Sequence, residues 1–197
     1  PTPASGPLLE FLAVYSKLPE THAAMITTGS QQGLDLIARA YVNPGDKVVM
    51  EAPSYLGAMQ VFGLVQADIV TVSQTEFGPN LEELEQCFAE QKPKMFYAVP
   101  DFHNPTGVCW ALETRQKVAE LCIQYNVAFI EDAPYRELRF SGEALPLVSD
   151  FCPQHSIVLR SFSKIASPGL RIGVVTGKSR YLKPLIKIKQ GAEPHCR

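Results

Sequence analysis

Residues 94–135 read KMFYAVPDFHNPTGVCWALETRQKVAELCIQYNVAFIEDAPY and carry the strongest indication of the fold. Two short runs rich in β-branched and aromatic residues, Lys94–Val99 and Val127–Ile130, are typical of buried strands. Between them, Ala111–Tyr125 has the apolar spacing of a helix. A strand, a crossing helix and a second strand form the unit from which parallel sheets are built. The stretch therefore predicts an α/β protein with a mostly parallel sheet.

The same alternation continues on both sides of this unit. Strand character recurs in Ala24–Thr27, Lys47–Met50, Ala67–Val72 and Ser156–Leu159, and helical spacing in Leu8–Leu18, Gln31–Tyr41, Ser54–Val65 and Asn80–Glu90. Because strands alternate with helices, we expect helices on both faces of one sheet, in three α/β/α layers. We expect one domain over residues 1–197, with residues 1–18 as the candidate end of an N-terminal segment. Both ends look cut, since the chain has no initiator Met and stops directly after a basic helix.

Composition excludes several classes of function. The formal net charge of −2 gives no electrostatic footprint for nucleic acid. No apolar run approaches the roughly 18 to 20 residues that span a bilayer, and Pro1–Gly6 lacks the pattern of a secretory signal. We therefore expect a cytoplasmic protein without a membrane partner. The five cysteines (Cys87, Cys109, Cys122, Cys152, Cys196) lack metal-site spacing, so we expect reduced structural thiols and no metal.

Polar clusters follow five of the expected strands. In open parallel sheets ligands bind beyond the carboxyl ends of the strands, so these positions are candidates for a site. Each cluster alone favours a structural role, because a glycine-rich helix start is usually a cap and a lone lysine is usually a surface residue. Together they supply a lysine, carboxylates, phenols, an amide and a serine/arginine cradle for phosphate. The five clusters are Thr28–Gly33, Glu51–Tyr55, Pro100–Gly107, Glu131–Tyr135 and Arg160–Lys164, the last followed by Arg171.

Four of these stretches resemble the fold-type I pyridoxal-phosphate (PLP) enzymes of the class I/II aminotransferase group. They are Thr28–Gly33, Asn104–Gly107, Glu131–Tyr135 and Ser161–Lys164, the last continued by Pro168–Gly173. Their order and spacing are similar to those of the family from about Pro1 to Cys196. The motifs PDFHNPTG and DAPYRELRF most resemble those of the 2-aminoadipate/aromatic aminotransferase branch, and the MocR-type transcription regulators share these motifs. The resemblance implies the PLP-binding large domain of this fold, with the small domain missing.

The resemblance also implies roles for single residues. Lys164 would hold PLP through a Schiff base and later carry the proton, and Asp132 would keep the pyridine nitrogen protonated. Asn104 and Tyr135 would hydrogen-bond the phenolic oxygen of the ring, and Tyr55 would stack on the ring. Lys164, Asp132 and Tyr135 are thus the expected catalytic residues. The phosphate would lie against Ser30, Gln31, Ser161, Ser163 and Arg171, with close backbone approach at Gly29.

The activity implied is amino transfer between an amino acid and a 2-oxo acid by a full-length homodimer. Three alternatives stay open: a PLP-binding effector domain of a MocR-type regulator, another PLP reaction such as β-elimination or decarboxylation, and a fragment that does not fold stably. The family's substrate-carboxylate arginine belongs to the small domain, so we expect little activity from residues 1–197 alone. Two residues depart from the family: Arg160 stands where a small residue is common and predicts crowding, and His103 replaces the more usual Gln.

Overall fold

The computed structural model describes residues 18–134, 145–161 and 172–192. Within these ranges the chain forms one eight-stranded sheet in the order β1-β8-β7-β6-β5-β2-β3-β4. The strands β3, β2, β5, β6 and β7 pair in parallel, β8 runs against β7 and β1, and the short edge strand β4 runs against β3. Their bounds are β1 (His22–Thr27), β2 (Lys47–Ala52), β3 (Asp68–Thr75), β4 (Gly78–Pro79), β5 (Met95–Ala98), β6 (Ala128–Ala133), β7 (Ser156–Ser161) and β8 (Gly173–Lys178).

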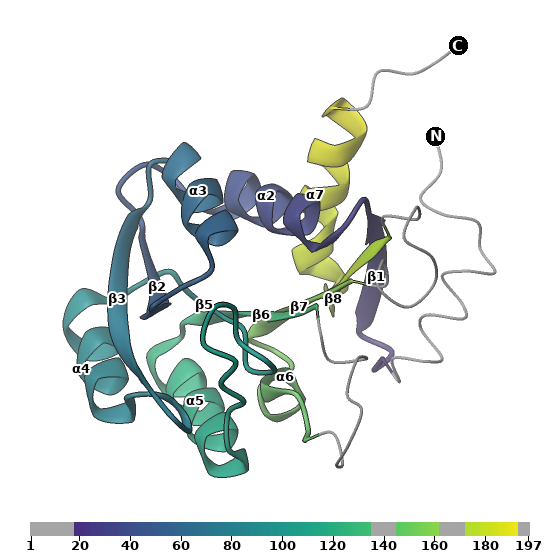
Figure 1. Cartoon of the computed structure of the whole chain (residues 1–197). Coiled ribbons are helices and arrows are strands. Elements are labelled where there is room, and N and C mark those ends of the chain that lie inside the picture. Colours follow the sequence, from purple (N-terminus) through teal and green to yellow (C-terminus); the bar gives the residue numbers. More distant parts are fainter. Residues whose placement is uncertain (1–17, 135–144, 162–171, 193–197) are drawn as a thin grey trace.

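Helices cover both faces of the sheet, which gives the expected three layers (Figure 1). One face carries α2 (Ser30–Tyr41), α3 (Leu56–Leu64) and α7 (Ser179–Ala192). The other carries α4 (Leu81–Gln91), α5 (Leu112–Tyr125) and the single-turn α6 (Val148–Phe151). The predicted α/β/α architecture with a mostly parallel sheet is therefore confirmed.

Alternation along the strands divides the interior into two cores. Val48 and Met50 of β2 pack among the residues beneath α2 and α3, whereas Val49 between them packs on the side of α4 and α5. Successive side chains of a strand point to opposite faces, so central strands with apolar residues on both faces read as continuous hydrophobic runs. On the α5 side, Phe96, Trp110 and Phe129 bring their ring centroids within 5.5 to 6.1 Å of one another.

Most helices and strands begin and end within two or three residues of the bounds predicted from the sequence. Asn80, the first residue of the helix predicted over Asn80–Glu90, caps α4, because its Oδ1 accepts hydrogen bonds from the backbone N–H groups of Glu82 and Glu83, both at 3.1 Å. The helix expected from Ser54 begins at Leu56, since Tyr55 keeps an extended backbone. The strands β4 and β8 and the helix α6 were not expected at all. The helix predicted over Leu8–Leu18 falls almost wholly outside the described residues.

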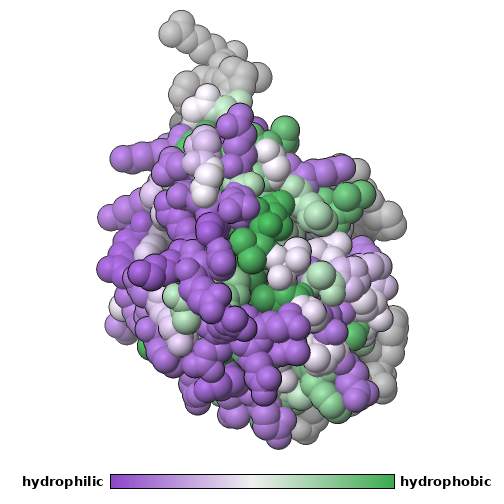
Figure 2. All heavy atoms as spheres, turned by 90° about the vertical axis from the view of Figure 1, so that its left-hand side faces the viewer, coloured by the Kyte–Doolittle hydropathy of each residue, from purple (hydrophilic) through white to green (hydrophobic). Residues whose placement is uncertain are grey.

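The surface around α3 is unusually apolar. Figure 2 faces the β3 edge and shows mostly hydrophilic groups around a hydrophobic area in its upper half. In α3, Leu56 is 66% exposed and Leu64 is 80% exposed. A helix that is apolar on all sides usually lies between other elements rather than at a surface. No helix in the described ranges is both long enough and apolar enough to cross a membrane.

Candidate functional site

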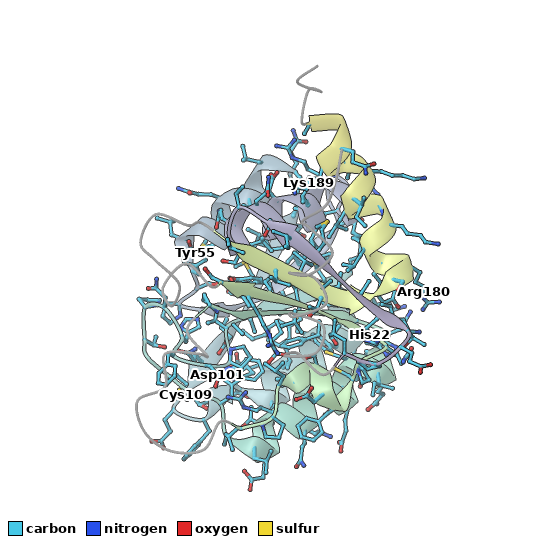
Figure 3. The ribbon with its side chains drawn as sticks, turned by 90° about the vertical axis from the view of Figure 1, so that its right-hand side faces the viewer. His22, Tyr55, Asp101, Cys109, Arg180 and Lys189 are labelled. Carbon is cyan, nitrogen blue, oxygen red and sulfur yellow. The ribbon has the colours of Figure 1, made fainter. Side chains whose placement is uncertain are left out.

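A cavity of about 160 Å³ opens at the carboxyl ends of the parallel strands. Figure 3 shows this edge of the sheet at the labels Tyr55 and Asp101, opposite the edge that carries His22 and Arg180. Five of the residues expected to bind a ligand line the cavity, and they come from five separate segments at the ends of β1, β2, β5, β6 and β7. The lining residues are Ser30, Tyr55, Val99, Asn104, Asp132, Pro134 and Ser161.

Asp132, near the end of β6, is the most distinctive residue of the cavity. Its side chain is buried, and its Oδ2 accepts a hydrogen bond of 2.7 Å from the hydroxyl of Tyr97. Its other oxygen, Oδ1, is also buried and has no hydrogen-bond partner among the described residues. Burial raises the pKa of Asp132 to about 6, although the Tyr97 hydrogen bond opposes this rise. A buried carboxylate oxygen without a donor costs free energy, so Oδ1 is the atom to which a ligand N–H would bind.

The preceding residue, Glu131, shows what a fully bonded carboxylate looks like in the same strand. It points to the opposite face, where its two oxygens accept hydrogen bonds from the backbone N–H groups of Val148 (3.0 Å) and Ser149 (2.8 Å). These N–H groups belong to the first turn of α6 and would otherwise lack an acceptor. Burial raises the pKa of Glu131, whereas the two backbone hydrogen bonds lower it. Glu131 therefore stabilises the start of α6, and of these two carboxylates only Asp132 lines the cavity.

The first turn of α2 presents backbone N–H groups at the rim of the cavity. Its N-cap, Gly29, has φ +118° and provides no side-chain cap, and Ser30 opens the helix beside the cavity. A Cβ on Gly173, at the start of β8, would lie 2.4 Å from the carbonyl carbon of Gly29, so only glycine fits there. Uncapped N–H groups and the helix dipole together favour an anion at this position.

The neighbouring Gln31 does not line the cavity. Its Nε2 instead donates a hydrogen bond of 3.1 Å to the carbonyl of Gly57, in the first turn of α3. Gly57 also makes room for Tyr55, because a Cβ there would lie 2.6 Å from Cζ of the Tyr55 ring. The side chain of Gln31 thus joins the starts of α2 and α3, and the absence of a side chain at Gly57 lets the half-buried Tyr55 ring reach the cavity.

A buried ion pair anchors the loop that carries Asn104. Arg115 of α5 is wholly buried and binds both oxygens of Asp101, at 2.8 Å and 3.5 Å. The same guanidinium also donates to three carbonyl oxygens, those of Pro100 (3.2 Å), Trp110 (3.1 Å) and Pro146 (3.1 Å). Arg115 therefore fixes both ends of the 100–110 loop while Asn104 stays exposed at the cavity.

His103 and Arg160, the two departures from the resembled family, do not line the cavity. His103 is buried with its Nδ1 2.9 Å from Oγ1 of Thr106, and burial lowers its pKa. Arg160 lines a different cavity, beside Leu147 and Asp150 of the α6 side. Ser161 follows it in the strand, points to the opposite face and lines the first cavity. The rest of the serine-rich turn lies outside the described residues, so the expected crowding stays a prediction.

A second cavity, of about 220 Å³, lies at the opposite edge of the sheet. It is lined by the first residues of β5, β6 and β7 (Met95, Ala128, Ser156) and by Lys94. In the described ranges no group of three or more His, Cys, Asp or Glu side chains is arranged to hold a metal ion. Four cysteines in those ranges are free thiols: Cys87, Cys109, Cys122 and Cys152.

Comparison with known proteins agrees with this architecture. The sequence model of the family described as aminotransferase class I and II matches residues 8–192. The chain belongs to this family. The 2-aminoadipate transaminase of Thermus thermophilus is 38% identical over 99% of the chain, and aromatic-amino-acid aminotransferase 1 of Thermococcus litoralis is 36% identical over 98%. The chain spans 50% and 48% of the lengths of these two relatives.

Solved structures of the family have the same fold. The α-aminoadipate aminotransferase LysN of Thermus thermophilus, in complex with N-(5′-phosphopyridoxyl)-L-leucine, has a TM-score of 0.92 at 38% identity. The match covers 99% of this chain and 51% of that one. A transcriptional regulator of the HTH type from Bacillus subtilis is also similar, at 31% identity over 83% of the chain and 35% of the regulator.

Four residues expected in an aminotransferase site lie outside the described residues. They are Lys164, Tyr135, Ser163 and Arg171. Two of the expected strand-end clusters are therefore described only in part: Glu131–Pro134 at the end of β6, and Arg160 with Ser161 at the end of β7. Their assigned roles stay predictions.

Sequence reasoning missed two residues that support this site, Tyr97 and Arg115. For each of them the sequence contains a pattern that could have indicated the role. Tyr97 puts a hydroxyl inside the apolar run of β5, one strand away from Asp132. Arg115 shares a helix face with Val118, Ala119 and Cys122, all of them buried, and a cation on an apolar face indicates a buried ion pair.

Proposed function

We propose that the complete protein is a PLP-dependent aminotransferase that moves an amino group between an amino acid and a 2-oxo acid. One observation carries the proposal: Oδ1 of Asp132 is buried and has no hydrogen-bond partner in the described part of the chain, and Asp132 lines a cavity together with Ser30, Tyr55 and Asn104. The names of the relatives support it, since 2-aminoadipate and aromatic amino-acid aminotransferases are similar over nearly the whole chain.

The residues of the cavity fit the parts of PLP one by one. Asp132 offers an acceptor oxygen to a ring N–H, and the start of α2 offers N–H groups and Ser30 to a phosphate. Asn104 offers an amide to the phenolic oxygen, and Tyr55 offers an aromatic face. When bound, PLP supplies the electron sink that amino transfer needs. Ionised Asp132 favours the cationic ring, because the two charges face each other in a buried site.

Four further roles complete the proposed site. Lys164 binds the cofactor covalently and moves the proton, Tyr135 assists Asn104, and Ser163 and Arg171 join Ser161 at the phosphate. Gly29 and Gln31 keep the phosphate loop in place through the backbone of Gly29 and the bond from Gln31 to Gly57. The catalytic residues of this proposal are Lys164, Asp132 and Tyr135.

We also propose that the complete protein is a cytoplasmic homodimer. The exposed Leu56 and Leu64 support a further contact at α3, because large apolar side chains at a surface commonly mark an interaction site. Since α3 follows Tyr55 directly, such a contact would lie next to the cavity. Light scattering of the complete protein would give its mass in solution, and a monomer at micromolar concentration would refute the dimer.

The test of the function uses the complete protein loaded with PLP. Mixing it with 2-aminoadipate or an aromatic amino acid should convert the bound PLP to pyridoxamine phosphate, which chromatography of the released cofactor measures. Adding a 2-oxo acid should convert it back. A protein that holds PLP but never aminates it with any of the twenty amino acids or 2-aminoadipate would contradict the enzyme and favour an effector-binding regulator.

A further inference from the structure

We propose that Tyr97 is a positioning residue of the cofactor site: its hydroxyl occupies Oδ2 of Asp132 and so assigns Oδ1 to the ring nitrogen of the ligand. The inference rests on the proposed function, since it names how Asp132 is held for PLP. It adds a residue from β5 that does not itself line the cavity.

The register of two neighbouring strands creates this contact. Tyr97 of β5 is the partner of Ile130 in β6, so its side chain lies on the same face as that of Asp132, two residues further on. The hydroxyl reaches past one residue level and donates to Oδ2 at 2.7 Å. This is within the range of a strong O–H···O⁻ hydrogen bond.

The ring of Tyr97 is held by its surroundings. It is 0% exposed and packs edge-on against Phe62 of α3, with ring centroids 6.2 Å apart and planes at 66°. Met50 of β2 belongs to the same buried cluster. Interiors packed at this density leave a ring few alternative rotamers, so the hydroxyl stays directed at Asp132.

The contact has two consequences for Asp132. It orients the carboxyl group, because one oxygen is fixed and the other must then face away from Tyr97. It also favours the ionised carboxylate, as shown by its effect on the pKa of Asp132, which burial raises and the Tyr97 hydrogen bond lowers. An ionised Asp132 is what a protonated pyridine ring requires.

A purely structural role for Tyr97 gives a different expectation. In that case its hydroxyl uses Asp132 only as the nearest acceptor, and removing it changes stability but not the state of the ring nitrogen. The nitrogen itself therefore has to be observed, because activity alone would not separate the two roles.

The experiment compares complete proteins loaded with PLP that carries ¹⁵N in the ring. NMR of the wild type should show a protonated ring nitrogen, and Asp132→Asn should give the resonance of a neutral pyridine. We expect Tyr97→Phe to lie between these two positions and to bind PLP about tenfold more weakly, as loss of one hydrogen bond to a charged group implies. Tyr125→Phe is the matched control, because it removes a hydroxyl at the end of α5 that donates a hydrogen bond of 3.3 Å to Glu85 of α4. Its ¹⁵N resonance and its affinity for PLP should match those of the wild type.

The outcomes separate the two proposals. A wild-type protein that binds no PLP defeats the proposed function. A wild type with a protonated ring nitrogen, together with a Tyr97→Phe resonance at the same position, overturns the role of Tyr97 alone. If Tyr97→Phe does not fold, 3-fluorotyrosine at position 97 keeps the ring shape and donates more strongly. Its resonance should then move away from the neutral reference, and an unchanged resonance overturns the role.

Discussion

Asp101 and Asp132 are both buried near the carboxyl edge of the sheet, yet the protein bonds them in opposite ways. Both oxygens of Asp101 face Arg115, which also binds three backbone carbonyl groups. Among the residues that the structure describes, Asp132 has one bonded oxygen and one buried oxygen without a partner. Buried polar groups are nearly always satisfied, so an unsatisfied carboxylate oxygen of a residue that lines a cavity indicates a place for a ligand. The closed cluster, Asp101 with Arg115, holds the 100–110 loop in place, and we propose that the open cluster, Asp132 with Tyr97, is left to bind a ligand.

The largest effect should come from Asp132→Asn, which breaks the open cluster. The substitution removes the charge opposite the cofactor ring, and losing one partner of a buried pair costs about 3–5 kcal/mol, or roughly 100-fold or more in rate. We expect PLP to remain bound and amino transfer in the complete protein to fall by that factor. Asp68→Asn, at the exposed start of β3, is the control and should leave the rate unchanged. Equal turnover in Asp132→Asn and wild type would refute the role of Asp132.

Breaking the closed cluster should affect stability instead. Arg115→Met leaves Asp101 buried without its cation, so we expect the free energy of unfolding to fall by about 3–5 kcal/mol. Chemical denaturation of the complete protein measures this loss. The double variant Arg115→Met with Asp101→Asn should recover part of it, because the uncompensated charge is gone. A loss below about 0.5 kcal/mol, typical of an exposed ion pair, would contradict the closed cluster.

The pH dependence of stability tests the burial of Asp132 without any cofactor. Folding raises the pKa of Asp132 from 3.8 to about 6, so between these values the folded state binds more protons than the unfolded state. The free energy of unfolding of the cofactor-free protein should therefore decrease as pH rises through this window. Asp132→Asn removes that slope and should be more stable than wild type by about 1–3 kcal/mol at pH 8, but not at pH 4.

The matching control is Glu51→Gln. Burial raises the pKa of Glu51 to about 7, against the hydrogen bond from Gln74. In Glu51→Gln the free energy of unfolding should lose a similar decrease with rising pH. In the wild type the decrease due to Glu51 should end about one pH unit higher than that due to Asp132. Parallel stability curves for Asp132→Asn and wild type from pH 4 to pH 8 would show that Asp132 is not destabilised by burial.

The smallest effect should come from Glu131→Gln. The amide keeps one acceptor oxygen for the first turn of α6 and loses the other, which costs about 1 kcal/mol in the free energy of unfolding. Amino transfer should change little, because Glu131 points away from the cavity. A rate loss as large as that of Asp132→Asn would erase the distinction between these two neighbouring carboxylates.

The sequence predicted the sheet because its central strands are continuous apolar runs bounded by turns. It also predicted where the polar residues gather, since parallel strands end at one edge. It did not predict β8, a short glycine-bounded strand that pairs antiparallel with both of its neighbours. Nor did it predict the bond from Tyr97 to Asp132, because that contact depends on the register of two strands whose residues lie 35 positions apart.

The single most direct test is to trap the cofactor on the complete protein. Borohydride reduction after incubation with PLP, followed by digestion and mass spectrometry, identifies the lysine that carries the phosphopyridoxyl group. We predict the label on Lys164 and no stable label in Lys164→Ala. A label on Lys94, which lines the cavity at the opposite edge of the sheet, would contradict the account.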